Sequence, residues 1–294
     1  MRWVTFRGPG SDDDRVGVVD GETVQALEPG VRLVDLLGDL AGAAARAGAE
    51  SFPLDGVRLR SPIPDPPTVR DFYAFEQHVR TARARRGLEM DPDWYELPVF
   101  YFSNPYAVNG PGDEVSAPPG SAELDFELEV AAVVGRPGAD VAAADAEPLI
   151  AGYTIMNDWS ARDLQRREMK LSMGPVKGKD FATTLGPWLV TPDELAPYRT
   201  ETGYDLAMTA SVNGLEYSRA RWSEVHFGFD RMVEYASRGT RVMPGDVLGS
   251  GTCGTGCILE LSLVHGSEAY PWLKPGDEVV LEVEGLGRLR NVVR

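Results

Sequence analysis

The chain has 294 residues, with 29 Lys and Arg against 45 Asp and Glu, 3 His and 2 Cys, and its formal net charge is −16. This acidity argues against nucleic acid or an anionic membrane surface as a partner, because either would need a basic face on the protein. Two cysteines are too few to stabilise a chain of this length by disulfide bonds, so the composition excludes a disulfide scaffold and favours a reducing compartment.

The first sixty residues are predicted to form short strands and turns followed by short helices. The strands are expected over residues 3–7, 16–19 and 23–27, and the helices over 31–40 and 41–49. The strongest break in the chain is the proline-rich run Ser61–Pro67, because proline fixes φ and removes backbone donors. We therefore predict a small N-terminal domain over residues 1–65 and a larger domain over residues 66–294.

Export and membrane segments are not evident in the sequence. The first residues lack the apolar core of a signal peptide, and no apolar run approaches the ~20 residues of a membrane span. We expect a cytoplasmic protein.

The larger domain is predicted to be rich in strands, with few helices. The expected helices cover Phe72–Arg86, Ser160–Met169 and Phe227–Ser237, and Ser160 with Asp163 has the spacing of a capping box. The main expected strands cover Leu124–Val134, Ile150–Met156, Asp205–Val212, Cys257–Val264 and Glu278–Val283. This balance, with its many Gly and Pro turns, predicts a mixed α/β, largely antiparallel fold rather than a doubly wound sheet.

The segment Glu123–Val130 alternates acidic and apolar residues without exception. On a strand, alternate side chains share a face, so four carboxylates would lie ~7 Å apart with no basic residue among them. A solvated acidic face explains this pattern, and so does a pair of carboxylates that clamps a divalent cation such as Mg²⁺ or Ca²⁺. The alternation itself leaves both interpretations open.

Other candidate polar groups lie in two further segments. Asp158 is placed where a strand is expected to end and a helix to begin, which suits a functional carboxylate and equally a turn or cap residue. Arg162 and Gln165 are three residues apart and share a helix face, where spacing alone favours exposure to solvent. Among the three histidines, His78 stands out as a possible base because Asp71 precedes it by about two helical turns.

The run Gly249–Glu260 contains a formal Gly-x-Gly-x-x-Gly pattern. A dinucleotide-binding loop of this kind needs a helix directly after it, and we reject that interpretation because a strand is expected from Cys257 onward. Cys253 and Cys257 lack the further ligands of a zinc site in this pattern and are interpreted as structural. Glu260 is either a buried acid, which would need a partner, or an acid that faces outward.

Lysine is scarce, and most lysines fall within Lys170–Lys179. A lysine there would be a compact donor for a developing oxyanion. The arginines of Arg80–Arg86 have the pattern of a solvated helix face, and the alternative is a basic flap over an anionic substrate.

Together these segments resemble the fumarylacetoacetate hydrolase family, in the family's order, from about Asp71 to the C-terminus. The resemblance rests on Asp71-Phe72-Tyr73 with Gln77-His78, Glu127-Leu128-Glu129, Asn157-Asp158-Trp159-Ser160-Ala161-Arg162-Asp163, Gly178-Lys179 with Phe181 and Thr183-Thr184, and Ser250-Gly251-Thr252 with Glu260. It implies a catalytic domain that forms a β-sandwich roll, a small N-terminal α+β domain and a homodimer.

The resemblance also implies a metal centre. An octahedral Mg²⁺ or Ca²⁺, with Mn²⁺ as a further candidate, would be held by Asp71, Glu127, Glu129 and Asp158. In this interpretation Glu123 and Asp125, the other acids of the alternating segment, receive no role.

The reaction implied by the resemblance is C–C bond hydrolysis of a 1,3-diketo acid, such as fumarylacetoacetate or an acylpyruvate. His78, oriented by Glu260, would activate water. The groups expected to stabilise the oxyanion and bind substrate are Arg162, Gln165 and Lys179. Further contacts to the substrate are expected from Tyr101 and Thr252.

The substrate is less well defined than the metal centre, because Met169 stands where the hydrolase has a substrate-contacting tyrosine. Superfamily relatives decarboxylate, hydrate or isomerise 2-oxo acids on a similar core, so a decarboxylase, a hydratase or dehydratase, or an isomerase is the alternative. A non-catalytic cation- or ligand-binding protein is a third hypothesis. His78 and Glu260 argue against it, because a binding module needs no general base.

Overall fold

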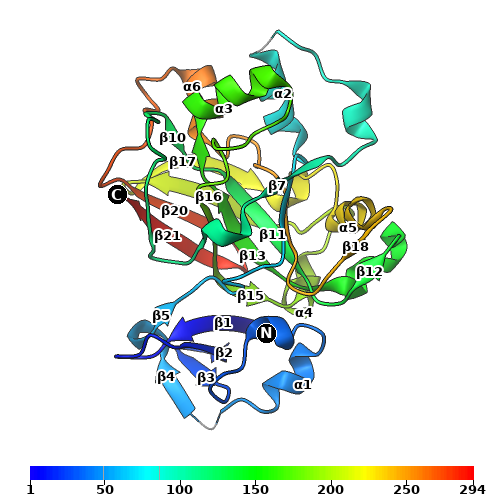
Figure 1. Cartoon of the computed structure of the whole chain (residues 1–294), viewed down its shortest axis with the longest axis vertical. Coiled ribbons are helices and arrows are strands. Elements are labelled where there is room, and N and C mark those ends of the chain that lie inside the picture. The colour runs from blue at the N-terminus through cyan, green and yellow to red at the C-terminus, as the bar shows by residue number, and fades with distance from the viewer. Residues whose placement is uncertain (49, 86) are drawn as a thin grey trace.

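The structure is a computed structural model, and it describes residues 1–48, 50–85 and 87–294. Across these residues the largest sheet has 12 strands (Figure 1). In spatial order its main path is β4 (Glu50–Pro53), β3 (Thr23–Ala26), β2 (Asp14–Asp20), β1 (Arg2–Arg7), β15 (Thr183–Val190), β13 (Ile150–Asp158), β11 (Leu128–Val134), β19 (Val247–Gly249), β6 (Val69–Phe72) and β7 (Phe100–Ser103). Two short strands lie beside this path, β5 (Arg58–Leu59) against β1 and β8 (Val108–Asn109) against β15.

A second sheet packs against the large one. Its strands are β17 (Leu215–Arg221), β16 (Ala207–Val212), β20 (Glu278–Val283), β21 (Gly287–Val293) and β9 (Glu114–Val115). Two small ladders complete the strands of the described residues, namely β10 (Leu124–Asp125) with β14 (Ser160–Ala161), and β12 (Gly138–Ala139) with β18 (Arg241–Val242).

The helices are short and lie around the sheets. They are α1 (Leu40–Ala44), α2 (Glu76–Ala84), α3 (Arg162–Glu168), α4 (Pro192–Leu195), α5 (Phe229–Ser237) and α6 (Ile258–His265). Helices α2, α3 and α6 gather at the end of the molecule that is far from the N-terminal strands (Figure 1). Among the described residues, no helix is both long enough and apolar enough to cross a membrane.

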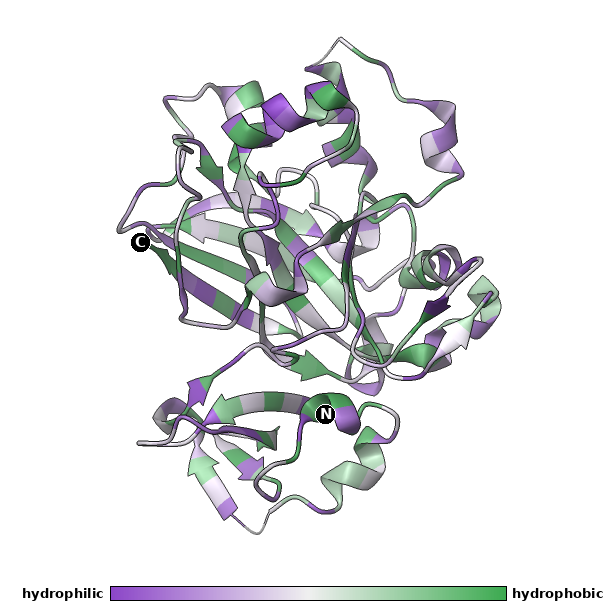
Figure 2. Ribbon diagram, viewed as in Figure 1, coloured by the Kyte–Doolittle hydropathy of each residue, from purple (hydrophilic) through white to green (hydrophobic). Residues whose placement is uncertain are grey.

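The core lies between the two sheets, where apolar side chains from both are buried. Strand β16 buries alternate residues, because one of its faces meets the core and the other is half-exposed. Strand β11 is buried at every position, as expected when both faces of a strand are covered. Figure 2 shows β11 as a mostly hydrophobic ribbon, whereas the outer helices alternate in colour.

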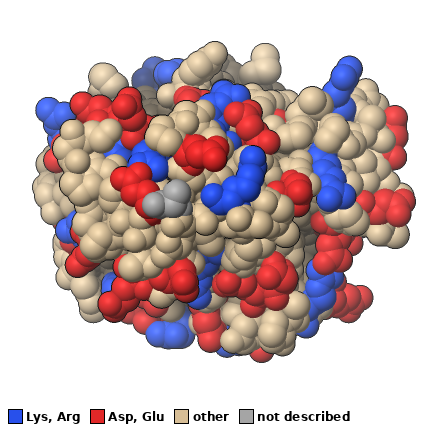
Figure 3. Space-filling view, turned by 90° about the horizontal axis from the view of Figure 1, so that it is seen from below, with Lys and Arg blue, Asp and Glu red and all other residues tan. Residues whose placement is uncertain are grey.

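The N-terminal strands continue the large sheet, since β1 pairs antiparallel with β15 through Arg2 opposite Val190 and Trp3 opposite Leu189. The division of the chain near residue 65 remains a prediction. Figure 3 views this end of the molecule and shows acidic and basic side chains interspersed. Arg7 and Asp14, on the neighbouring strands β1 and β2, form an ion pair at 2.6 Å.

The predicted mixed α/β, strand-rich and largely antiparallel fold is confirmed, but one predicted strand is wrong. Residues from Ile258 onward form helix α6 instead of a strand. A short apolar run is compatible with either structure, and here the backbone N–H groups of Ile258 and Leu259 donate to the buried carboxylate of Asp125, at 2.7 and 2.9 Å. This acceptor favours the first turn of a helix.

The existence of α6 removes the reason given above for rejecting a dinucleotide loop, but the rejection holds on other grounds. The N–H of Gly251, in the glycine-rich loop, donates to the carboxylates of Asp71 and Glu129, at 3.2 and 3.0 Å. Carboxylates of the protein thus accept from this loop and from the first turn of α6, where a pyrophosphate would have to bind.

Further predicted boundaries differ from the structure. The helix expected over 31–40 is reduced to a 3-10 turn at Leu33–Asp35, and the helix expected over 41–49 is α1, which ends at Ala44, with residue 49 outside the described residues. The expected continuous strand from Leu124 is interrupted after Asp125, so β10 and β11 belong to different sheets. Ser160 pairs in β14 and is not a helix cap, and α3 begins at Arg162. The expected helix Phe72–Arg86 is shorter because Phe72 still pairs in β6, and its last residue, Arg86, lies outside the described residues.

Candidate active site

Four buried carboxylates meet where neighbouring strands of the large sheet end. Their ligand oxygens lie within 4.8 Å of one another, and they belong to Asp71, Glu127, Glu129 and Asp158. The register explains this convergence, because Glu129 on β11 lies opposite Met156 on β13, and Asp71 on β6 lies opposite Gly249 on β19. We refer to these four side chains as the carboxylate quartet.

The electrostatics of the carboxylate quartet favour a bound cation. Burial, followed by repulsion from neighbouring carboxylates, holds the pKa of Glu129 well above its usual range. Burial likewise raises the pKa of Asp71 and of Asp158, although Lys179 opposes both shifts. The Oδ1 atom of Asp158 is buried without a hydrogen-bond partner. An orphaned oxygen among four converging carboxylates fits a hard divalent cation that takes oxygen ligands.

Glu127 differs from the other members of the quartet. Burial acts to raise its pKa, but the positive charges of Lys179 and Arg162 outweigh burial, and the pKa is lowered. The Lys179 ammonium donates to Glu127 and to Asp158, and the same carboxylates raise the pKa of Lys179 despite its burial. Lys179 is therefore a buried cation at the edge of the quartet.

His78 and Glu260 form a second buried cluster. They are 182 residues apart in sequence, and α2 and α6 bring His78 Nδ1 to 3.0 Å from Glu260 Oε2. Because a carboxylate accepts this bond, Nδ1 is the donor, and in the neutral imidazole Nε2 then carries the free lone pair. The ring of Tyr73 packs edge-on against the imidazole at 5.8 Å. Glu260 is thus the buried acid with a partner, one of the two possibilities that the sequence leaves open.

Arg162 is buried, which contradicts the exposure that its spacing with Gln165 favours. Its side chain donates through Nε to Asp125 at 2.8 Å, through Nη2 to Glu127 at 2.6 Å and through Nη1 to Gln165 at 3.0 Å. These bonds link the helix face that carries Arg162 and Gln165 to the quartet. The two residues therefore lie at the predicted site rather than in open solvent.

The two predicted substrate contacts both touch the quartet. The Tyr101 hydroxyl donates to Asp158, and burial with the nearby charge of Asp158 holds the pKa of Tyr101 well above its usual range. The Thr252 hydroxyl donates to Glu129 at 3.4 Å. Neighbouring Gly251 has φ +80°, and a Cβ there would lie 2.6 Å from the carbonyl oxygen of Phe72, so this loop approaches the quartet only with glycine.

Sequence reasoning missed the role of Asp125. Its carboxylate is fully buried and joins Arg162 to the first turn of α6. The solvated acidic face proposed for the alternating segment is wrong for most of its members, since Asp125, Glu127 and Glu129 are buried and only Glu123 is partly exposed. The unbroken alternation was a signal for this residue, but the break between β10 and β11 that buries it was not predictable.

The arginine-rich end of α2 makes contacts away from the quartet. Arg80 pairs with Glu76, and Arg83 donates to the carbonyl oxygen of Glu89 at 2.7 Å. In the described part of Arg80–Arg86, these bonds favour the interpretation as a solvated helix face over that of a basic flap above an anionic substrate.

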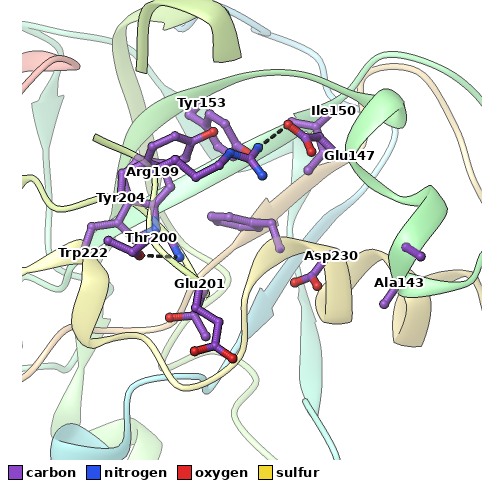
Figure 4. Close-up of a pocket in the computed structure, with 14 residues that line it drawn as sticks. Ala143, Glu147, Ile150, Tyr153, Arg199, Thr200, Glu201, Tyr204, Trp222 and Asp230 are labelled. Atoms are coloured by element: carbon purple, nitrogen blue, oxygen red, sulfur yellow. Dashed lines mark hydrogen bonds and ion pairs between the residues drawn. The ribbon is translucent and has the colours of Figure 1, made fainter. Parts of the chain in front are cut away.

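A cavity of about 220 Å³ lies in another part of the protein (Figure 4). Its wall includes Tyr153, Tyr204 and Trp222, and Arg199 pairs with Glu147 at its edge. None of the residues lining this cavity is a predicted site residue. The cavity is therefore separate from the quartet and from the His78–Glu260 pair.

Comparison with known proteins places this geometry among enzymes. The sequence model of the fumarylacetoacetate (FAA) hydrolase C-terminal domain matches residues 68–294. A rice (Oryza sativa subsp. japonica) fumarylacetoacetase is 31% identical over 278 residues, which cover 76% of this chain and 65% of that relative, so the match spans just under two-thirds of the relative's length.

Two relatives with other activities match over more of their length than the rice protein does. A mitochondrial oxaloacetate tautomerase of Rattus norvegicus is 30% identical, and the match covers all of this chain and 91% of the relative. The solved structure of a 5-carboxymethyl-2-hydroxymuconate delta-isomerase from Mycobacterium smegmatis is 28% identical with a TM-score of 0.71, and covers all of this chain and 99% of that one. The chain belongs to the fumarylacetoacetate hydrolase family, whose members include hydrolases, tautomerases and isomerases.

Proposed function

We propose that this protein is a divalent-cation-dependent hydrolase that cleaves a C–C bond of a 1,3-diketo acid. The observation that carries the proposal is the buried His78–Glu260 pair beside the carboxylate quartet. An electrostatic interaction with His78 is among the causes that lower the pKa of Glu127, which supports the proximity of the two side chains. A base next to a cation site suits the activation of water rather than simple binding.

The carboxylate quartet would hold the cation, for which Mg²⁺, Ca²⁺ and Mn²⁺ are the candidates, because all of its ligand atoms are oxygens. When bound, such a cation supplies positive charge that offsets the negative charge on the oxygens of a diketo acid.

The residues of the chain perform the proton transfer. His78 Nε2 takes a proton from water, while Glu260 holds Nδ1–H and stabilises the imidazolium that forms. The resulting hydroxide attacks a carbonyl carbon, the C–C bond breaks, and its electron pair leaves as an enolate that regains a proton. The side chains of Arg162, Gln165 and Lys179 would stabilise the oxyanion formed by the attack.

A keto–enol tautomerase or isomerase acting on a 2-oxo acid is the second candidate. The rat tautomerase favours this candidate, because its match covers all of this chain and 91% of the tautomerase. The match with the rice hydrolase covers 76% of this chain and 65% of that protein. The same His78 would then move a proton between carbon and oxygen, with no water added and no C–C bond broken. Decarboxylation and hydration of a 2-oxo acid are further reactions that the same site would support.

The deciding experiment combines product analysis with variants. Purified Mg²⁺-loaded protein is offered fumarylacetoacetate, a set of acylpyruvates and oxaloacetate. Two acids in equal amounts indicate a hydrolase, CO₂ a decarboxylase, and a changed enol absorbance with no new acid a tautomerase. His78→Ala is expected to lower turnover at least about 100-fold, in the range by which general bases contribute. The matched control is His226→Ala, and full activity in His78→Ala or after removal of cations would contradict the proposal.

A further inference from the structure

Cys257 lies beside the catalytic pair, although the sequence alone offered it no further zinc ligands. One ligand atom from each of His78, Cys257 and Glu260 lies within 4.8 Å of the other two, and all three side chains are buried. We propose that these residues form a site for a thiophilic divalent cation such as Zn²⁺, separate from the carboxylate quartet, and that its occupation inactivates the catalytic pair.

The spacing of the ligand atoms suits one ion. Two ligand atoms that each lie about 2.0 Å from a tetrahedral zinc ion are about 3.3 Å apart. His78 Nδ1 and Glu260 Oε2 are separated by 3.0 Å. A cation can therefore replace the proton that these two atoms share with only a small displacement of either side chain, and the sulfur of Cys257 supplies the third ligand.

The site at Cys257 and the carboxylate quartet are expected to prefer different cations, because their ligand atoms differ. Imidazole nitrogen, thiolate sulfur and one carboxylate oxygen are the ligands that zinc takes, and three protein ligands leave a fourth position for an exchangeable group. The quartet offers oxygen alone, which suits Mg²⁺, Ca²⁺ or Mn²⁺. Zinc is thus expected to prefer the site at Cys257 even when the quartet is saturated with Mg²⁺.

Occupation of the site by a cation prevents His78 from acting as a base. The thiol of Cys257 gives its proton to solvent when it becomes a ligand. A neutral imidazole that gives the Nδ1 lone pair to a cation carries its proton on Nε2, so His78 has no lone pair left to accept a proton from water. This consequence rests on the proposed function, whereas binding of the cation does not.

Cobalt(II) is the probe that tests the site, because it follows zinc in its choice of ligands and reports a thiolate ligand by near-ultraviolet absorption. Protein saturated with Mg²⁺ is titrated with Co²⁺ alone. We expect one thiolate-ligated Co²⁺ for each chain and displacement of that ion by Zn²⁺. A titration without the thiolate absorption would overturn the proposal.

Cys257→Ser removes the sulfur and keeps the fold, because residue 257 is the N-cap of α6, a position that favours serine. We expect it to lose the thiolate absorption and to weaken Zn²⁺ binding by about 100-fold or more, since even the outer partners of metal ligands contribute 10–100-fold. Cys253→Ser is the matched control, because Cys253 is also buried and unpaired but is outside the cluster. Absorption retained in Cys257→Ser, or lost in Cys253→Ser, would overturn the site.

Turnover in the presence of Zn²⁺ separates this proposal from the proposed function. Each variant is compared with its own zinc-free rate. Wild-type and Cys253→Ser are expected to lose activity as the thiolate absorption develops, and Cys257→Ser is expected to require about 100-fold more Zn²⁺. Full activity with the absorption fully developed would overturn the inactivation and the role of His78 as the base, but would leave the cation site standing.

Discussion

Arg162 shows how burial changes the meaning of a spacing pattern. A separation of three positions places Arg162 and Gln165 on one helix face, and most such faces are exposed. Here the Arg162 side chain is 3% exposed, and its three guanidinium nitrogens donate to Asp125, Glu127 and Gln165. A buried arginine needs this full set of acceptors, because an unpaired buried charge is costly. Its chemistry is therefore decided by acceptors that are distant in sequence.

Asp163, the next residue, is expected to stabilise the start of α3. Its carboxylate accepts hydrogen bonds from the Ser121 hydroxyl at 2.7 Å, the Ala122 N–H at 2.8 Å and the Leu164 N–H at 2.9 Å. Burial acts to raise the pKa of Asp163, but these bonds outweigh burial and the pKa is lowered. Asp163→Asn is expected to lower the free energy of unfolding by about 1–2 kcal/mol at neutral pH, measured by urea denaturation.

The sign of the pH dependence follows from the lowered pKa. Stabilisation by Asp163 is complete above the unfolded-state value of about 3.9 and is lost as the pH falls through the lower folded-state value. The difference between wild-type and Asp163→Asn should therefore shrink in acid. Asp13→Asn, an exposed change, is the control and should have little effect. A difference that grows on acidification would contradict this account.

At the scale of elements, the sequence predicts types of structure better than it predicts ends. Strand β13 and helix α5 are predicted from the sequence, because apolar periodicity and the Gly or Pro residues at the ends of elements are local signals. Helix α6 was mistaken for a strand because its first turn depends on Asp125, which is 133 residues earlier. The residues proposed for the site could be named from motifs, but their convergence depends on strand register, which no local pattern specifies.

Asp125 connects three elements, and its loss should affect all of them. It lies on β10, accepts from Arg162 on α3 and from the first turn of α6, which carries Glu260. Asp125→Asn leaves Arg162 short of one buried negative charge, and we expect a loss of about 3 kcal/mol in the free energy of unfolding. We also expect kcat to fall by at least about tenfold with a smaller change in KM, because Glu260 and Arg162 are misplaced while the quartet is intact.

The control for this variant comes from the same alternating segment. Glu123 is partly exposed and pairs with Arg166 at 2.5 Å on the outside of α3. Glu123→Gln should change the stability by less than about 1 kcal/mol and leave kcat unaffected. Equal losses in Asp125→Asn and Glu123→Gln would show that the segment matters only as a whole. An Asp125→Asn protein with normal kcat would contradict the positioning role.

At the scale of the whole molecule, the net charge of −16 divides into two parts. Few of the acids are buried, and on the face that Figure 3 shows the acidic side chains are interspersed with basic ones. The carboxylate quartet is different because it is buried, and its negative charges are opposed mainly by the positive charges of Lys179 and Arg162. Burying like charges together opposes folding unless protons or a cation neutralise them. Stability of the whole chain should therefore depend on cations.

We expect Mg²⁺, and Ca²⁺ or Mn²⁺ in its place, to raise the melting temperature. At a concentration of about 100 times Kd, a ligand that binds only the folded state adds about 2.7 kcal/mol, which corresponds to roughly 5 °C for a chain of this size. Glu129→Gln should abolish the rise. Because the pKa of Glu129 is well above its usual range, glutamine imitates the protonated acid, and the melting temperature in EDTA should change little. Glu123→Gln should keep the full rise, and an equal rise in Glu129→Gln would show that the cation binds elsewhere.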